Sequence, residues 1–299
     1  MVKKDQKKAY IFAVISVLLW STVATAFKLT LRETGYVELL LMSSLFSFFA
    51  LFFLLLFQKK LYLLKKLRPG DYVDTALLGF LNPFLYYLII FKAYSLLPAQ
   101  LAQPLNQIWG VVIVLFSIPL LKQKVTIKTF AGVLVSFFGV FVLSTEGKLF
   151  SFEIKEPFGV FLALFSSIVW SLYWIYNTRS RRDPVVSLFL CFVFGLIFIL
   201  IYLLLFHQTF QFSFLALAGS LYIGVFEMGI TYVLWLKALK FTITTAKISI
   251  LIYLVPFISL IFIKFILGEK ILLSSLAGLV FIISGILISR TKNVSNIKP

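Results

Sequence analysis

Glu227 is the residue of this sequence best placed to do chemistry, because almost everything around it is apolar. It stands in the stretch FEMGITYVLWLKALK, and between residues 215 and 236 the small polar side chains beside it are Ser220 and Thr231. A charge at the centre of an apolar helix in lipid costs about 2.5–3.5 kcal/mol, so such a residue has a partner or a function by default. Glu227 could bind an amine or carry a proton; alternatively, a protonated Glu227 could hydrogen-bond a neighbouring helix.

The amides of the segment AQLAQPLNQIWG form a second polar group. Gln100, Gln103 and Gln107 recur on one face of a helix, and Asn106 borders that face. Pro104 lies among them, where it removes a backbone hydrogen bond and favours a kink. Uncharged amides beside an irregular backbone suit a small zwitterion, although amides also pack helices together.

Aromatic and polar residues of other segments are candidates for the same site. In SIVWSLYWIYN, Tyr173 and Asn177 share a helix face, and Trp20 stands in the related stretch VLLWST. Aromatic side chains can pack against apolar parts of a ligand, whereas Trp174, near a segment end, is expected at the lipid–water interface. Lys247 begins an apolar segment, where it could contact a carboxylate ligand near the inner mouth of such a site.

The elements that must position these residues are membrane helices. Of the 299 residues, 61% are hydrophobic and the mean hydropathy is +1.04, against about 45–50% apolar residues in a soluble domain. The net charge of +17 comes from only 13% charged residues in short clusters between apolar blocks, which indicates membrane orientation rather than nucleic-acid binding. We therefore expect an all-α integral membrane protein, with the lipid bilayer as its partner and no nucleic acid.

Several classes of protein are excluded by residues that the sequence lacks. With Cys191 as its one cysteine and His207 as its one histidine, the chain has no internal disulfide framework and no histidine-based metal site is expected. No HExxH motif, acidic cluster or Walker A loop is present, so we expect neither a cofactor nor ATP-driven pumping by this chain. An integral membrane enzyme is the rival of another class, but it would need a nucleophile with a base, or metal ligands, near a membrane face.

A spanning helix needs about 20 mostly apolar residues, and this length predicts ten transmembrane helices. They lie near residues 9–31, 36–57, 73–93, 98–121, 127–144, 157–178, 185–206, 214–236, 246–267 and 271–289. With the N-terminus in the cytoplasm, 21 of the 28 Lys and Arg residues fall inside and 7 outside, which predicts two cytoplasmic termini. Residues 24–26 resemble a signal-peptide cleavage site, but the apolar run has a spanning length and is expected to be retained.

The chain repeats itself at a spacing of about 145–150 residues. VLLWST matches SIVWSL, IIFKAYSLL matches VLWLKALKF, and LLKQKVTIKTFAGVLVSFFG matches ILGEKILLSSLAGLVFIISG. The division predicts a five-helix repeat at 1–145, an external linker at 146–156 and a second five-helix repeat at 157–299. Because five is odd, the second repeat enters the membrane from the opposite side, which is the architecture of many secondary transporters.

The repeat also pairs polar residues between its halves. Asn82 corresponds to Glu227, and Tyr86 corresponds to Thr231, which predicts one polar face from each half around a shared centre. A second set of matched positions consists of glycines seven residues apart in the fifth and tenth spans. These are Gly132, Gly139, Gly278 and Gly285. Small residues let helices approach closely, so we interpret the glycines as packing seams and as a candidate homodimer face.

The sequence resembles the drug/metabolite transporter superfamily, in particular its EamA-type ten-helix members. The resemblance rests on LLWSTVATAFKL, PLNQIWGVVIVLFSIPLLKQK, LWLKALKFT and LVPFISLIFIKFILGEKI, and the last contains the Pro…Gly-Glu signature at Pro256, Gly268 and Glu269. The resemblance implies a five-plus-five bundle with both ends cytoplasmic and a central cavity lined by spans 1, 3, 4, 6, 8 and 9. The first half departs from the pattern, since Gln123 stands where the second half has Glu269. A helix-end or loop contact is the role we expect for Glu269.

The segment around Gln107 and Trp109 is also similar to the aromatic and neutral amino-acid exporters of this superfamily. The resemblance thus implies a secondary transporter in the bacterial inner membrane, moving an amino acid or a related neutral or amine-bearing solute by alternating access, as an exporter. Proton coupling through Glu227 is a candidate mechanism. A sugar-phosphate or nucleotide-sugar carrier is the alternative, but it would need Arg or Lys near the midplane to bind phosphate.

Overall fold

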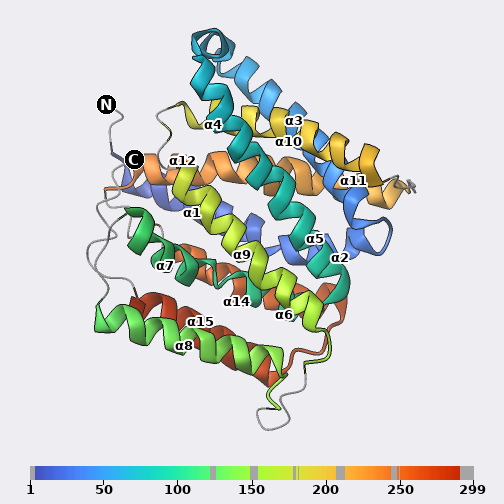
Figure 1. The fold of residues 1–299 in the computed structure, drawn as a ribbon, viewed down its shortest axis with the longest axis vertical. Coiled ribbons are helices and arrows are strands. Elements are labelled where there is room, and N and C mark those ends of the chain that lie inside the picture. Colours follow the sequence, from blue (N-terminus) through green and yellow to red (C-terminus); the bar gives the residue numbers. More distant parts are fainter. Residues whose placement is uncertain are drawn as a thin grey trace.

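The computed structural model describes residues 4–121, 126–148, 154–177, 180, 182–206, 213–243, 248 and 250–289. Helices are the regular structure of these residues, and no strand occurs among them. Figure 1 shows them as a bundle of long, tilted rods, with the α8 and α15 pair at one end.

The described part of the first half of the chain contains ten helical elements. They are α1 (Gln6–Ser21), α2 (Val23–Leu31), α3 (Tyr36–Phe57), η1 (Leu61–Lys66), α4 (Pro69–Gly79), η2 (Phe80–Leu85), α5 (Tyr86–Leu96), α6 (Ala99–Asn106), α7 (Trp109–Leu121) and α8 (Ile127–Ser144). The described part of the second half contributes α9 (Pro157–Asn177), α10 (Pro184–Phe206), α11 (Phe214–Tyr222), η3 (Ile223–Ile230), α12 (Thr231–Phe241), η4 (Ile250–Leu254), α14 (Val255–Phe262), η5 (Ile263–Leu267) and α15 (Leu273–Ser289).

The chain is a multi-pass membrane protein by the length and composition of its helices. Among the described residues, eight continuous helical runs, several of which join two or three of these elements, are at least 18 residues long and apolar enough to cross a membrane. They are Gln6–Leu31, Tyr36–Phe57, Pro69–Leu96, Ala99–Phe116, Ile127–Ser144, Pro157–Asn177, Pro184–Phe206 and Phe214–Phe241. Two further apolar helices, Leu251–Leu267 and Leu273–Ile288, are shorter and lie within the predicted ninth and tenth spans. The count of ten spans therefore stays a prediction.

Local hydrogen bonds explain where several helices begin. The side chain of Asp5 accepts from the backbone N–H of Lys8 at 3.0 Å and starts α1. Thr126 caps α8 and Ser213 caps α11 in the same way, through the N–H groups three residues later. Each cap satisfies a backbone donor that the first turn of a helix would leave unpaired.

Two long spans change helical pitch halfway along. The third predicted span runs through the π-helical segment η2, where Asn82 has an extended backbone (φ −150°, ψ 120°) before Pro83. Proline disfavours helical geometry at the residue before it and has no N–H to donate, so the helix breaks there. The eighth predicted span passes through the π-helical segment η3, which contains Glu227. Polar side chains thus sit where both helices are irregular.

Helices α1 and α12 pack as an antiparallel pair. The backbone N–H of Asp5 donates to the carbonyl oxygen of Phe241 at 2.9 Å, while at the other end the rings of Trp20 and Trp235 are 5.5 Å apart. Helices α5 and α9 also pack as an antiparallel pair. A Cβ on Gly159, near the start of α9, would touch the side chain of Leu97 just after α5, and contacts continue toward the other ends of both helices.

Helices α3 and α10 pack against each other and against the two irregular spans. The rings of Phe48 and Phe189 are 5.2 Å apart, and Lys60 pairs with Asp183 at 2.7 Å near the ends of the same two helices. A Cβ on Gly79 would lie 2.6 Å from the carbonyl oxygen of Cys191 in α10. These contacts hold the third span close to α10.

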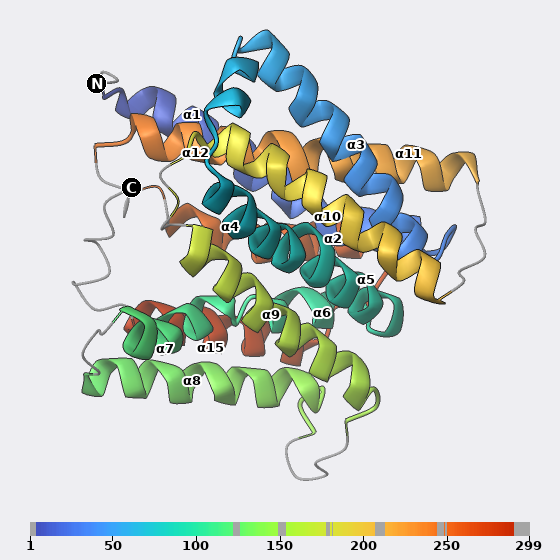
Figure 2. The same ribbon diagram turned by 45° about the horizontal axis from the view of Figure 1, so that its top comes forward.

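Helices α8 and α15 form a separate antiparallel pair, seen at the bottom of Figures 1 and 2. A Cβ on Gly139 would lie 2.6 Å from the carbonyl oxygen of Gly278, and Gly285 faces the carbonyl oxygen of Gly132. Ser136 adds a hydrogen bond of 3.0 Å from Oγ to the carbonyl oxygen of Ile282. The glycine seams are therefore used within the chain, and reading them as a dimer face is wrong because their surfaces are already covered.

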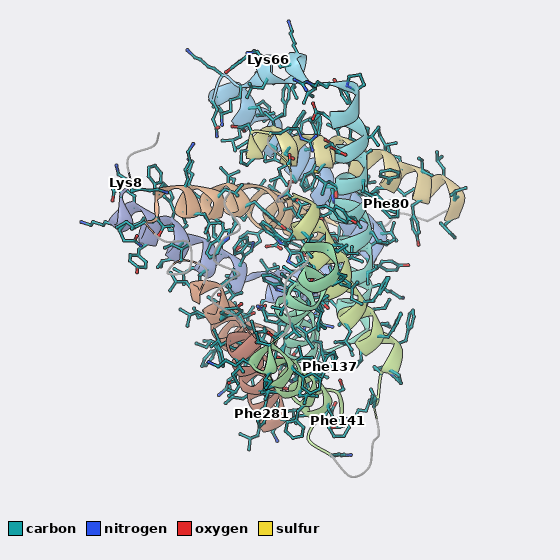
Figure 3. All side chains as sticks on the ribbon, turned by 60° about the vertical axis from the view of Figure 1, so that its left-hand side comes forward. Lys8, Lys66, Phe80, Phe137, Phe141 and Phe281 are labelled. Atoms are coloured by element: carbon teal, nitrogen blue, oxygen red, sulfur yellow. The ribbon has the colours of Figure 1, made fainter. Side chains whose placement is uncertain are left out.

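The outward faces of this pair carry aromatic side chains. Phe137 and Phe281, labelled in Figure 3 at the α8–α15 end of the molecule, are 49% and 38% exposed. Exposed phenylalanines on an apolar helix suit contact with lipid chains, because hydrocarbon does not penalise apolar surface as water does.

Candidate functional site

The carboxyl group of Glu227 lies inside the bundle, and one of its two oxygens has no hydrogen-bond partner in the protein. The hydroxyl of Tyr87 donates a hydrogen bond of 3.2 Å to Oε1, whereas Oε2 is buried and has no protein partner. Among the residues that the structure describes, no lysine or arginine pairs with this carboxyl. A buried acceptor without a partner is costly, so the free oxygen points to a ligand or a proton as its partner.

Three tyrosines surround this carboxyl. Tyr86 and Tyr87 begin α5, directly after η2, and their rings meet edge to face at 4.9 Å. Tyr232, in the first turn of α12, follows Glu227 by five residues on the same span, and its buried hydroxyl has no protein partner. Tyr86 and Tyr87 thus follow η2 directly, and Tyr232 lies two residues after the end of η3.

Trp170 of α9 joins these tyrosines to further rings. It stacks on Tyr86 with ring centroids 4.4 Å apart and on Tyr173 at 5.6 Å, and it meets the Tyr232 ring at 6.0 Å. Trp20 reaches Tyr232 from α1 at 5.8 Å. We call this group the aromatic cluster. Its members are Trp20, Tyr86, Tyr87, Trp170, Tyr173, Trp174 and Tyr232.

The position of Trp174 corrects a prediction. Its ring stacks on Tyr232 at 6.4 Å with an interplanar angle of 14° and meets Trp170 edge to face at 5.9 Å. The residue therefore belongs to the aromatic cluster and not to an interfacial belt. The prediction failed because distance from a span end says nothing about which way a side chain points.

Amide side chains border the cluster on two sides. The Tyr86 hydroxyl donates to Oδ1 of Asn106 at 3.3 Å, and Nδ2 of Asn106 donates to Oγ of Ser166 at 2.8 Å, which ties α5, α6 and α9 together. Asn82 is 1% exposed and lies beside the Tyr173 hydroxyl, while its Oδ1 has no protein partner. Asn106 is thus held by the fold, and Asn82 keeps a free acceptor.

Three more polar atoms of the predicted site are buried without a protein partner. They are Oε1 of Gln103, Nε2 of Gln107 and Oγ1 of Thr231. Thr231 is fully buried and follows Glu227 by four residues, on the span that carries the carboxyl. Buried atoms without a protein partner also occur outside the predicted site, for example at Ser144 and Ser187, so these three are compatible with a binding role and do not by themselves exclude helix packing.

Gln100 makes structural hydrogen bonds, unlike Gln103 and Gln107 on the same predicted helix face. Its Oε1 accepts from the backbone N–H of Leu272 at 2.9 Å and from Oγ of Ser275 at 3.0 Å. Glu269 lies in the same contact, accepting from the N–H of Ala99 at 2.9 Å and from that of Gln100 at 3.2 Å. Glu269 therefore caps the first turn of α6, which agrees with the helix-end contact expected for it.

The structure brings most of the predicted site residues together. Around Glu227 and the aromatic cluster it places Trp20, Asn82, Tyr86, Asn106, Tyr173 and Thr231, and it leaves polar atoms of Gln103 and Gln107 buried and unpaired. Asn177 is the last residue of α9, one helical turn beyond Tyr173, and no contact joins it to the cluster among the described residues. Lys247 lies outside the described residues, so its predicted role is untested.

The sequence analysis missed Tyr87 and Tyr232. Tyr87 is fully buried and supplies the only hydrogen bond that the Glu227 carboxyl accepts from the described residues. Tyr232 follows Glu227 by five residues, and a regular α-helix would turn it to another face. The wider π-helical turn of η3 changes that register, and the sequence carries no clear signal for it.

Chemically, the arrangement suits recognition of a solute rather than bond making. It combines one carboxyl, several aromatic rings and uncharged amides inside a membrane bundle. Over the described residues, no group of three or more His, Cys, Asp or Glu side chains could hold a metal ion.

Comparison with known proteins is consistent with this geometry. The model of the EamA-like transporter family matches residues 7–145 and again residues 157–291. An uncharacterized transporter of Clostridium kluyveri is 27% identical over 295 residues, covering 96% of this chain and 94% of its own length. The uncharacterized transporter YvbV of Bacillus subtilis is 29% identical over 230 residues, covering 74% of this chain and 72% of its own length.

A further relative and a solved structure resemble the chain as well. An uncharacterized transporter of Archaeoglobus fulgidus is 26% identical over 233 residues and covers 77% of this chain and 80% of its own length. One crystal structure superposes with a TM-score of 0.66 at 20% identity, covering 97% of this chain and 98% of its own. At that identity, the superposition shows a shared fold alone.

Proposed function

Because the chain belongs to the EamA-like transporter family, we propose that it is a secondary transporter of a small amine-bearing or neutral metabolite, such as an amino acid. In this proposal it works as an exporter in the cytoplasmic membrane. The observation that carries the proposal is the Glu227 carboxyl, which lies among aromatic rings with one oxygen unpaired. A buried acid in a spanning helix is the expected mark of a substrate or ion pathway.

Alternating access through an inverted repeat is the mechanism that we propose. The sequence repeat aligns α1 with α9 and α12 with α5, and the antiparallel pair α1–α12 has its counterpart in the antiparallel pair α9–α5. Gly79 and Gly224 are 145 residues apart and pack closely against α10 and α3 respectively, which are also repeat mates. Equivalent contacts in the two halves support the repeat, and rocking of one half against the other would expose the site to each side in turn.

The pair α8 and α15 supports the inverted orientation of the second repeat relative to the first. These helices are repeat mates in sequence, and Gly139 faces Gly278 while Gly132 faces Gly285, so they run in opposite directions. Opposite directions are what five spans per repeat require. We therefore propose ten spans, two cytoplasmic termini and repeats at 1–145 and 157–299 joined by the linker 146–156, in line with the double match of the family model.

Glu227 has two roles in this proposal. In its ionised form it can accept hydrogen bonds from a substrate amine, and in its protonated form it can carry the proton that drives exchange. A sugar-phosphate carrier is not supported, because the described Lys and Arg residues form no ion pair or hydrogen bond with the aromatic cluster or with Glu227.

The proposal is tested by counterflow of labelled metabolites in proteoliposomes of the purified chain at two pH values. Liposomes loaded with an unlabelled solute should accumulate the labelled form of the same solute, and only for amine-bearing or neutral members of the panel. A dependence of the rate on pH is expected if Glu227 carries a proton. Absence of counterflow for the whole panel would contradict the transport proposal.

A further inference from the structure

The buried polar atoms without a protein partner at Glu227, in the aromatic cluster and on the neighbouring polar residues of the predicted site differ in kind. Three are acceptor oxygens, namely Oε2 of Glu227, Oδ1 of Asn82 and Oε1 of Gln103, whereas Nε2 of Gln107 can only donate. The hydroxyls of Thr231 and Tyr232 can serve either way. A solute that satisfies this set must bring several N–H or O–H donors to the carboxyl, which is what an ammonium group does.

The charge of the site points the same way. Glu227 is the one ionisable acid in contact with the aromatic cluster among the described residues, and no described base pairs with it. Tyrosine and tryptophan rings attract a cation through their negative faces, and the cluster brings Tyr86, Tyr232 and Trp170 together beside the carboxyl. Both features favour a positive group over a neutral one.

A substrate carboxylate would meet the opposite environment. In an α-amino acid the ammonium and the carboxylate share one carbon, so an ammonium bound to Glu227 brings its own carboxylate close to that acid. Two like charges in a medium of low dielectric constant repel strongly, and the free donors, Nε2 of Gln107 and the Tyr232 hydroxyl, are neutral and cannot balance the charge. The free amino acid is therefore a poorer match than the amine that remains when its carboxylate is removed.

We infer that the solute is an organic monocation, a primary amine on an aromatic body without a carboxylate. This inference rests on the proposed transport function and narrows its substrate class. The ammonium contacts Oε2 of Glu227, the oxygens of Asn82 and Gln103 are further acceptors without a protein partner, and the aromatic body packs in the cluster around Trp170.

Equilibrium binding of tritiated phenethylamine to the purified full-length chain in lipid nanodiscs tests the inference directly. The competitors share the phenyl ring and differ in charge: phenylalanine adds a carboxylate, 3-phenylpropanoate has only the carboxylate, and 2-phenylethanol is neutral. Phenethylamine should bind, and phenylalanine should compete about tenfold or more weakly. The other two should compete more weakly still.

Two variants link the binding to the carboxyl. Glu227→Gln should weaken phenethylamine binding about tenfold or more, because it removes the charge but keeps the size of the side chain. Glu38→Gln makes the same change at a buried acid of α3 and should bind like the unchanged protein. Equal binding by Glu227→Gln and the unchanged protein would overturn the inference.

The outcomes also separate this inference from the transport proposal. If phenylalanine competes as well as phenethylamine, the inference is wrong. Lys247, which the sequence predicts to contact a carboxylate ligand, is then the first candidate to bind the carboxylate of phenylalanine. If phenethylamine does not bind while another solute of the counterflow panel is exchanged, the inference is wrong and the transport proposal stands. If no solute of the panel is exchanged, the transport proposal fails, and the inference fails with it.

Discussion

The hydroxyl of Tyr87 donates to Oε1 of Glu227 at 3.2 Å, across the two spans that change helical pitch at η2 and η3. This contact orients the carboxyl so that Oε2 is left for a solute or a proton. A binding group is effective when its own neighbours fix its position, so Tyr87 is a positioning residue in this account.

Tyr87→Phe should weaken substrate binding without preventing it. The ring and its packing stay, and only the donor to Glu227 is lost, which costs about 1 kcal/mol, a loss of roughly fivefold in affinity. Binding titrations of the solute identified by counterflow measure this directly. Tyr10→Phe, at a tyrosine that is 40% exposed in α1, is the control and should leave affinity unchanged. An unchanged affinity for Tyr87→Phe would contradict the positioning role.

Glu269→Gln should lower stability. The carboxylate of Glu269 accepts two backbone N–H groups at the start of α6, and the amide keeps at most one acceptor there and no charge. Loss of such a cap costs about 1–2 kcal/mol. Thermal unfolding in detergent measures the change. Glu146→Gln alters an exposed ion pair with Lys155 and should shift unfolding little. Equal shifts for both variants would show that Glu269 does not act as a cap.

Gly139→Ala should loosen the α8–α15 pair. The added Cβ would lie 2.6 Å from the carbonyl oxygen of Gly278 and 2.8 Å from the backbone nitrogen of Ile282, so the helices must move apart. Overpacking of this kind costs about 1–3 kcal/mol. Gly70→Ala is the matched control, since nothing lies within 4 Å of the added atom. A normal melting temperature for Gly139→Ala would contradict the close approach of these helices.

Cysteine labelling from each side of the membrane tests the proposed topology. Lys65 and Lys155 are exposed, and the native Cys191 is buried, so it gives little background. In right-side-out cells, a membrane-impermeant maleimide should label Lys155→Cys and not Lys65→Cys, and inverted vesicles should reverse the result. Labelling of both from one side would contradict the odd number of spans between them.

The pattern of apolar residues was sufficient to predict much of the fold, because the length and hydropathy of a spanning helix are strongly constrained. The eight long helices of the structure fall within a few residues of eight predicted spans. The π-helical segments could not be predicted in the same way. Pro83 gave a local reason for a break near Asn82, but nothing in the sequence around Glu227 marks the wider turn of η3.

The glutamine row shows why the site was only partly predictable. Gln100, Gln103 and Gln107 share one predicted helix face, yet Gln100 binds the segment after Glu269, whereas Gln103 and Gln107 each keep a buried atom without a partner. Helical periodicity gives a direction from the axis, but it does not say what another part of the chain brings to that direction. The long-range contact that decides the matter joins residues about 170 positions apart.

The measurement that tests the central claim most directly is counterflow by Glu227→Gln in proteoliposomes, beside the unchanged protein and Glu38→Gln, over a range of pH. The account predicts that the unchanged protein and Glu38→Gln exchange the solute at similar rates. The exchange rate of Glu227→Gln should be about tenfold or more lower, with all three proteins folded alike. Exchange by Glu227→Gln at the rate of the unchanged protein at every pH would contradict the claim that its carboxyl meets the solute.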